Sequence, residues 1–333
     1  METRFQRFEA TLPELSVEAW NSFGSETPEF RELARQLLLA NAVCLDNEIY
    51  LISAWSNDAN TPLGLAIAVV GAMHGRPLVV LTVPGVLRLS RATAMWVAHD
   101  EDEPTISRAL LEEAMRLCRH LGIHDLTIAL CPERDPVVPT VATGLGFRPW
   151  LRQDLHQIHL TGPMRTDAYL ATLRADWRYD FRRNLRRPGK ASAEVVHAVD
   201  IPEPFIDRMW ELQLDMFRRK EQFFSYRQEA NLFRAIRERR GVVADASTLC
   251  LRDGQLLGYL VTYRTGNVSY LGAIGKAPDS SLNVYAALVA HALANELDHG
   301  ASIISLSYTE DDSKRRLGCT PFPMNNLFVR IRN

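Results

Sequence analysis

The chain has 333 residues, of which 47% are apolar and 23% are charged, and its formal net charge is −2. This length is sufficient for two domains of ordinary size, and the composition is that of a globular protein. The near-neutral charge excludes a global basic field for nucleic acid or membranes, so any nucleic-acid contact needs a local patch.

The cysteines and the N-terminus indicate a cytoplasmic protein. The five cysteines are scattered and form no CxxC pair, which favours a reducing compartment and buried thiols. Residues 1–15 lack the apolar segment of a signal peptide. The longest apolar run, 63–73, is too short and too interrupted for a membrane span and predicts strands instead. We therefore expect no membrane partner.

The first half of the chain is predicted to alternate helices and strands. A helix start at 16–20 and a helix at 29–41 come first. Three strands, a long helix, a strand, a short helix and a further strand follow, at 44–54, 63–73, 77–83, 106–121, 125–131, 138–144 and 148–160. Gly122 is expected to end the long helix.

This order, with Gly146–Phe147 after the short helix, resembles the second half of a GCN5-related N-acetyltransferase (GNAT) domain. Acyl-CoA domains of this kind hold pyrophosphate on the N–H groups at the start of the long helix. Here residues 99–104 read HDEDEP, and these carboxylates would repel a diphosphate. We expect a degenerate donor site in this half, although the acids could also simply complement the helix N-terminus.

A break at residues 161–163 is the expected domain boundary, with an N-terminal domain at 1–162 and a C-terminal domain at 163–333. A single helix is predicted from Thr166 to Pro188. Arginines recur on it at every fourth residue and form a ladder of Arg174, Arg178, Arg182 and Arg186. Arg183 and Arg187 make this ladder wider. Charge alone leaves two interpretations open, a phosphate-binding edge or a solvated helix face.

The second half is predicted to repeat the plan of the first. Its expected strands are 194–199, 247–252, 255–264, 268–275, 301–308 and 326–331, and its expected helices are 202–219, 229–240 and 282–297. Asp279, Ser280 or Ser281 is expected to cap the last of these helices. The fold class is therefore α/β with mixed sheets, in two domains with the same architecture.

The last predicted core strand leads directly into polar residues. Tyr308 lies at its carboxyl end, and an acidic turn and a short helix with Lys314, Arg315 and Arg316 follow. Strand ends beside a helix start are where α/β sheets place chemistry. The plain alternatives are that Asp311 and Asp312 only cap the helix and that Lys314 is a surface lysine.

Four segments of the second half make the resemblance more specific: DFRRNLRR at 180–187, MFRRKEQ at 216–222, LRDGQLLGYLVTYRTG at 251–266 and SYTEDDSKRRLG at 307–318. They resemble the FemAB-like and BioF2-like branch of the GNAT superfamily, and the first half resembles it in outline. FemAB-like proteins have two GNAT-like domains and use aminoacyl-tRNA to add amino acids to an amine. The resemblance thus implies tandem GNAT-like domains and an acyl donor that is a charged tRNA.

By this resemblance Lys314 would contact the donor's ester oxygen or ribose hydroxyls and stabilise the oxyanion of acyl transfer. Asp312 would orient Lys314 or accept a proton from the amine, and Tyr308 would donate to the leaving group. The donor's phosphates would be bound by arginines, namely Arg178, Arg182, Arg183, Arg186 and Arg315.

The sequence departs from acyl-CoA enzymes at the helix that begins near residue 282. The Pro-Gly pair of many relatives is replaced by Ser280–Ser281–Leu282, and the Gln or Arg signature ending in Gly-x-Gly is absent. The histidine pairs His120/His124 and His156/His159 have no third ligand nearby, so we expect no metal and no resident cofactor.

We therefore expect an acyltransferase that moves an aminoacyl group from aminoacyl-tRNA onto the amine of a small-molecule acceptor. Two alternatives stay open. One is an acyl-CoA-dependent N-acyltransferase of the same fold, and the other is an inactive GNAT pair that acts as a binding module.

Overall fold

The structure is a computed structural model, and it describes residues 1–7, 23, 49–57, 62–73, 76–82, 95–98, 102–133, 137–199, 201–220, 246–278, 282–306, 308 and 311–332. The helices expected at 16–20, 29–41 and 229–240 lie outside the described residues, as does Cys44. The other four cysteines are buried free thiols, as the sequence predicts.

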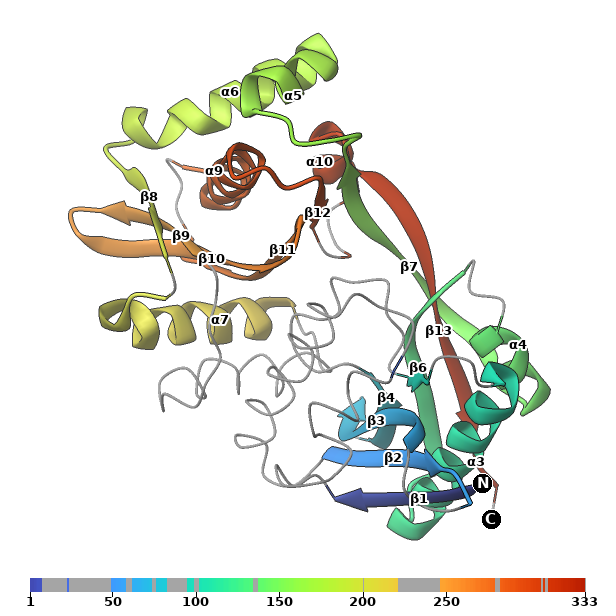
Figure 1. Cartoon of the computed structure of the whole chain (residues 1–333). Coiled ribbons are helices and arrows are strands. Elements are labelled where there is room, and N and C mark those ends of the chain that lie inside the picture. Colours follow the sequence, from blue (N-terminus) through green and yellow to red (C-terminus); the bar gives the residue numbers. More distant parts are fainter. Residues whose placement is uncertain are drawn as a thin grey trace. The chain divides into compact units, whose positions relative to one another are not determined.

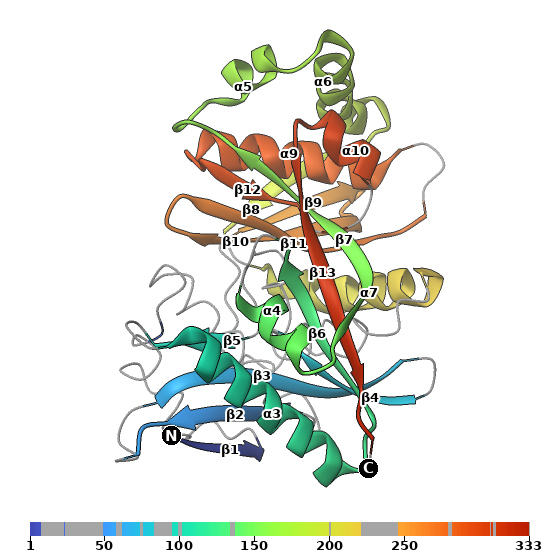
Figure 2. The same ribbon diagram turned by 90° about the vertical axis from the view of Figure 1, so that its right-hand side faces the viewer.

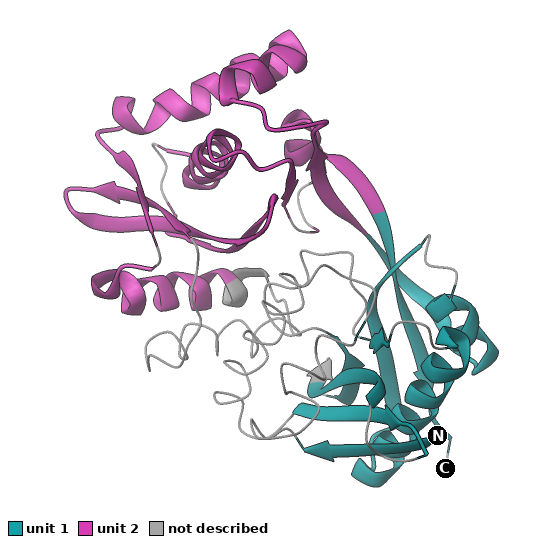
Figure 3. Cartoon of the chain, in the orientation of Figure 1, with its two compact units in different colours: residues 1–153, 323–333 teal, residues 154–322 magenta. Residues whose placement is uncertain are grey.

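The chain forms two compact units, and Figure 3 shows them in different colours. Unit 1 comprises Met1–Gln153 and Pro323–Asn333, and unit 2 comprises Asp154–Phe322. The divisions fall inside two strands, β7 (Arg148–His159) and β13 (Thr320–Arg330). The domain limits 1–162 and 163–333 stay a prediction. The two compact units have other limits, because β7 and β13 each contribute residues to both units.

Unit 1 has a mixed sheet with the strand order β1-β2-β3-β4-β6-β13, and β5 pairs with β3 (Figure 1). The strands are β1 (Glu2–Arg7), β2 (Ile49–Trp55), β3 (Pro62–Met73), β4 (Arg76–Leu81), β5 (Met95–Val97) and β6 (Asp125–Pro132). The one long helix described here, α3 (Glu103–Leu121), connects β4 to β6, which are parallel neighbours. The short helix α4 (Val137–Gly144) then leads to β7.

Both ends of α3 are set by local chemistry. The Asp102 carboxylate accepts hydrogen bonds from the Thr105 amide at 3.3 Å and the Thr105 hydroxyl at 2.6 Å, so it caps the helix. At the other end Gly122 adopts the left-handed conformation with φ +66°. For Asp102 the helix-complementing interpretation of the acidic segment is therefore confirmed.

In unit 2 the strand order is β7-β12-β11-β10-β9-β8, again with parallel and antiparallel pairs. Its remaining strands are β8 (Glu194–Ala198), β9 (Ala246–Arg252), β10 (Gln255–Thr265), β11 (Val268–Lys276) and β12 (Ile303–Ser305). Its described helices are α5 (Thr166–Thr172), α6 (Ala175–Lys190), the 3-10 turn η3 (Glu203–Phe205), α7 (Ile206–Lys220), α9 (Val284–Asp298) and α10 (Asp311–Arg316).

The helices of unit 2 cover both faces of this sheet. Figures 1 and 2 show α9 on one face, packed against β9, β10 and β11, and α7 on the opposite face. The outer side of α9 is covered by α5 and α6. As in unit 1, the long helix connects two parallel neighbours, here β11 and β12. The repeated plan and the α/β class with mixed sheets are confirmed.

The helix predicted at 166–188 is wrong in two respects. It is broken, because Leu173 and Arg174 are extended, with ψ 154° and 151°, between the end of α5 and the start of α6. Leu173 is 8% exposed, so its packing in the core prevails over the helical periodicity. Pro188 does not end α6, which continues to Lys190.

Other element boundaries differ from the prediction. The cap of α9 is Asn283, whose side chain accepts from the Ala286 amide at 3.1 Å. Among the described residues of the strand expected at 301–308, ladder pairs form over β12, with β11 on one side and β7 on the other. β13 begins at Thr320 instead of residue 326, since its two prolines weaken the strand signal. Neither β1 nor β5 is predicted from the sequence.

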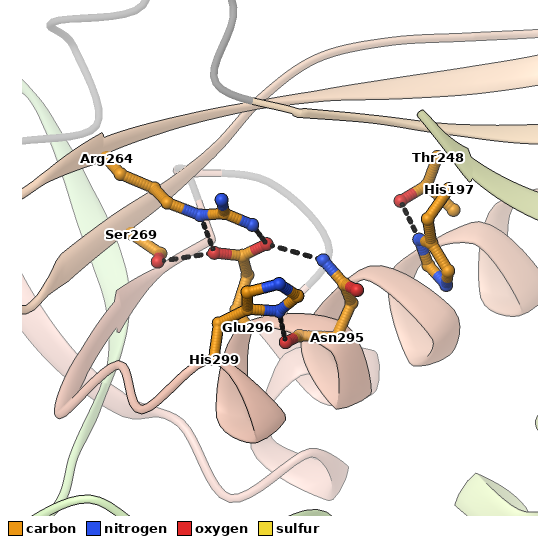
Figure 4. Close-up of polar contacts among 7 residues, drawn as sticks. All are labelled: His197, Thr248, Arg264, Ser269, Asn295, Glu296 and His299. Carbon is orange, nitrogen blue, oxygen red and sulfur yellow. Dashed lines mark hydrogen bonds and ion pairs between the residues drawn. The ribbon is translucent and has the colours of Figure 1, made fainter. Parts of the chain in front are cut away.

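An ion pair with a buried carboxylate fixes α9 to its sheet (Figure 4). Glu296 on α9 is 1% exposed, and Arg264 on β10 donates two hydrogen bonds to it, each 2.7 Å long. Ser269 on β11 and Asn295 donate to the same carboxylate at 2.7 and 3.0 Å. Burial acts to raise the pKa of Glu296, but the hydrogen bonds from Arg264 and Ser269 hold it below its ordinary value.

We predict that Glu296→Gln destabilises the protein by about 3 kcal/mol, because the Arg264 guanidinium loses its carboxylate partner. The measurement is the free energy of urea unfolding. Glu194→Gln, at an exposed position on β8, is the matched control and should change it by less than about 0.5 kcal/mol. Equal effects of the two substitutions would contradict the assignment.

The same pair predicts a pH dependence. Because the folded pKa of Glu296 lies below its ordinary value of 4.5, its contribution is complete above that pH and is lost as pH falls through the folded value. The difference in unfolding free energy between the parent protein and Glu296→Gln should therefore shrink on acidification below about pH 4.5. A constant difference down to about pH 3 would refute this.

Candidate functional site

The candidate site lies at the carboxyl end of β12, where α10 carries Lys314. Lys314 is 2% exposed, whereas Asp312, Ser313, Arg315 and Arg316 on the same helix are exposed. α10 therefore turns its lysine into the fold and its two arginines outward. The alternative that Lys314 is a surface lysine is wrong. Lysine is seldom buried, because its charge is costly to remove from water. The burial of Lys314 therefore makes it a candidate functional residue.

The C-terminal end of α10 is fixed to α5 and to the start of β13. The Lys314 carbonyl accepts from the amides of Leu317 at 2.9 Å and Cys319 at 3.2 Å. Between them Gly318 has φ +86°, and the Tyr169 hydroxyl donates to the Leu317 carbonyl. This turn holds the lysine helix in one orientation at the strand end.

Cys319 reports the environment next to Lys314. Burial raises the pKa of its thiol to about 12, while the charge of Lys314 acts to lower it. The thiol therefore stays protonated at neutral pH and is a poor nucleophile. We assign Cys319 to packing and not to chemistry.

The other two proposed catalytic residues are placed differently from Lys314. Tyr308 is half-buried and lies three residues beyond β12, so it is past the strand instead of at its end. Asp312 lies in the first turn of α10 and is exposed. A carboxylate at this position stabilises the helix through its interaction with the helix dipole, with or without a catalytic role. Their catalytic roles stay predictions.

The proposed donor-binding arginines lie on α6 and α10. Arg182, Arg183 and Arg186 are exposed, as is Arg315, and Arg178 is half-buried. Arg174 leaves the ladder, because it precedes α6 and its guanidinium lies 5.2 Å from the Trp177 ring centre.

Asp180 joins the two helices that carry these residues. Its carboxylate lies 2.9 Å from the Arg183 guanidinium on α6 and 3.3 Å from that of Arg316 on α10. The structure thus brings the arginine helix and the lysine helix together in unit 2. The sequence does not reveal that Asp180 bridges the two helices, nor that Tyr179 is 61% exposed beside the arginines. Tyr179 could have been found from its spacing of three, four and seven residues to Arg182, Arg183 and Arg186.

Each long helix is capped at its N-terminus by a side chain of the chain itself. In α3 the Thr105 amide is bound by Asp102, and Pro104 has no N–H. In α9 the Ala286 amide is bound by the Asn283 side chain, and the Ala287 amide by the Asn283 carbonyl at 3.1 Å. A diphosphate at either helix would have to displace these hydrogen bonds.

The described part of the chain shows neither a metal cluster nor a membrane-spanning helix. No group of three or more His, Cys, Asp or Glu side chains there is arranged to hold a metal ion. None of the described helices is both long enough and apolar enough to cross a membrane.

We predict that Gly318→Ala destabilises the protein by roughly 3 kcal/mol. About 1 kcal/mol comes from the left-handed backbone, and the rest from a methyl group 2.5 Å from the Tyr169 oxygen and 2.8 Å from Leu173 Cδ2. Gly266→Ala is the matched control, because φ is +56° there and nothing lies within 4 Å of the added carbon. It should cost only about 1 kcal/mol in thermal or urea unfolding. Equal losses would mean that α10 is not packed against α5.

No protein-family model and no curated protein matches the chain. Solved structures do match it. A tandem GNAT protein from the clavulanic acid biosynthesis pathway, solved without AcCoA, is 14% identical and superimposes with a TM-score of 0.58 over 100% of this chain and 99% of that chain. FemX is 11% identical, with a TM-score of 0.59 over 99% and 97%. L-PGS from Bacillus licheniformis is 12% identical, with a TM-score of 0.56 over 96% and 92%.

At these identities the likeness establishes the fold and leaves the activity open. It extends over both units and agrees with the repeated plan of strands, crossover helix and last strand. The assignment to the FemAB-like and BioF2-like branch stays a prediction. The chain therefore has a tandem GNAT fold.

Proposed function

We propose that the protein is an acyltransferase that moves an aminoacyl group from aminoacyl-tRNA onto the amine of a small-molecule acceptor, forming an amide. The observation that carries the proposal is the burial of Lys314, at 2% exposure, on the helix that follows the last core strand of unit 2. The resemblance to FemAB-like proteins in residues 307–318 and the tandem GNAT fold support it.

The chemistry of this transfer needs a fixed cation. The acceptor nitrogen attacks the ester carbonyl of the donor, and the carbonyl oxygen becomes an oxyanion. The Lys314 ammonium would stabilise that charge, and in a buried setting such an interaction is stronger than in water. As the tetrahedral intermediate collapses, the ester C–O bond breaks, the amide forms, and the ribose oxygen of the tRNA leaves.

Two protons move in this reaction. The attacking amine loses one, and the leaving ribose oxygen gains one. We assign the first transfer to Asp312, whose exposed carboxylate can pass a proton to water, and the second to Tyr308, three residues beyond β12. These two assignments are independent of that of Lys314.

The choice of donor follows from where phosphate could bind. The Thr105 amide at the start of α3 and the Ala286 amide at the start of α9 already have partners in the chain, which disfavours the pyrophosphate of CoA. Phosphate groups would instead meet Arg178, Arg182, Arg183, Arg186 and Arg315, whose guanidinium groups match phosphate oxygens. A tRNA end requires only a few such contacts, which is compatible with a net charge of −2. We propose no resident cofactor and a cytoplasmic location.

We predict that Lys314→Met lowers the rate of aminoacyl transfer by roughly 100-fold or more, since the oxyanion loses its cation. Methionine is unbranched and fills a similar space, so the fold should persist. The measurement is transfer of radiolabelled amino acids from a charged tRNA pool to a panel of amines. Arg208→Met, at an exposed position on α7, is the control and should retain the parent rate.

The same assay separates the rival functions. Turnover with acyl-CoA and none with charged tRNA would show that the donor is acyl-CoA. The fold and the role assigned to Lys314 would be unaffected. Full activity of Lys314→Met, with an unchanged melting temperature, would remove the assigned role of the lysine. Transfer from no donor, together with tight binding of a partner protein, would favour a binding module.

A further inference from the structure

We propose that the outer face of α6 binds single-stranded RNA, with Tyr179 stacking on an unpaired base and the surrounding cations contacting phosphates. The inference deepens the proposed function, on which it rests for the identity of the RNA as the single-stranded end of the donor. We call this surface the α6 outer face, and it consists of Tyr179, Arg182, Arg183, Arg186 and Lys190.

Helix geometry gathers these five residues on one side of α6. At about 100° per residue, the four cations lie within roughly 60° of the direction of Tyr179. All five are exposed, and they extend over about 16 Å along the axis. The opposite side of α6 is apolar and packs into the unit 2 core through Phe181, Leu185 and Trp177. The outer face is thus not needed for folding.

Tyr179 is the unusual member of this face. It is 61% exposed, which makes it the most exposed aromatic side chain in the described part of the chain. A single exposed aromatic residue is ordinary on a protein surface. This one lies among four cations, and that combination of an aromatic ring and basic groups is what single-stranded nucleic acid requires.

The ring and its neighbours are partly held in place. The Arg183 guanidinium lies 5.9 Å from the Tyr179 ring centre and 2.9 Å from the Asp180 carboxylate. Arg186 donates from Nε to the Arg182 carbonyl at 3.2 Å. Holding these side chains before binding reduces the entropy lost when the ligand arrives.

Acidic residues neutralise only part of this face, and Asp167 of α5 lies 4.0 Å from Arg182. Asp176 pairs with Arg174 at 3.4 Å, and Asp180 bridges Arg183 and Arg316. The outer face therefore carries net positive charge in a protein whose overall charge is −2. The complement of this surface is a flexible anion that also offers flat, stacking groups.

The composition of the α6 outer face favours RNA over an anionic membrane as its ligand. A helix that lies in a membrane interface needs a broad apolar face to insert into the lipid. The apolar face of α6 is already used, because Phe181 is 1% exposed in the core. On the outer face Tyr179 is the single large apolar group, so we commit to RNA.

The test measures binding of the full chain to a fluorescently labelled eight-nucleotide single-stranded RNA, followed by fluorescence anisotropy at several salt concentrations. Tyr179→Ala should weaken binding roughly tenfold, because the mutant protein cannot stack a base at this position. Tyr179→Phe should bind like the parent protein, since the ring is retained. Arg208→Ala, on α7 and 46% exposed, is the control for removal of a surface arginine and should have no effect.

The phosphate-binding cations have a separate signature. The double substitution Arg182→Ala with Arg186→Ala should flatten the dependence of log affinity on log salt by about 1.4, or about 0.7 for each phosphate that is no longer neutralised. Arg208→Ala should leave this slope unchanged.

Three outcomes would overturn the proposal: no binding by the parent protein at about 50 mM salt, equal affinity of the parent and Tyr179→Ala, or Tyr179-dependent binding to phosphatidylglycerol vesicles in place of RNA. Because this assay uses uncharged RNA, it does not depend on catalysis. Binding without transfer would refute the proposed function alone, and transfer with unchanged RNA binding by Tyr179→Ala would refute the α6 outer face alone.

Discussion

The parallel pairing of β11 and β12 is the constraint on which unit 2 depends. Parallel neighbours cannot be joined by a hairpin, so the chain must cross over the sheet, and α9 is that crossover. Its close approach requires glycine in the strand beneath it, because a Cβ at Gly258 would lie 2.6 Å from Val284 Cγ1. Unit 1 has the same arrangement, because a Cβ at Gly64 would lie 2.5 Å from Ile106 Cγ2 of α3. The two halves therefore share a packing rule although their sequences differ.

The crossover also decides where the polar residues lie. Once α9 is fixed by the Arg264–Glu296 pair, β12 must run parallel to β11, and its carboxyl end delivers α10. The Tyr169 hydroxyl and the Asp180 carboxylate then connect α10 to α5 and α6. The position of Lys314 is thus a consequence of how the strands are connected. Tyr169 and Asp180 then keep α10 in place at the carboxyl end of β12.

Strong periodicity made most of the fold predictable, and tertiary packing decided the rest. The strands β9, β10 and β11 and the helices α3 and α9 follow from alternation or helical spacing together with glycine turns. The break at Leu173 does not, because it depends on the core that surrounds that side chain. The sequence SKRRLG likewise leaves open whether Lys314 lies in a site or on the surface, and only the structure shows that Lys314 is buried and Arg315 is not.

This division of the cations suggests two tasks with different physical requirements. Exposed arginines interact with phosphates through water and ions, so their contribution falls as salt rises. A lysine that is 2% exposed is screened much less, and its effect on a developing oxyanion should persist at high salt. Under the proposed function, capture of the donor and the chemical step would respond differently to ionic strength, with KM rising in salt while kcat stays nearly constant.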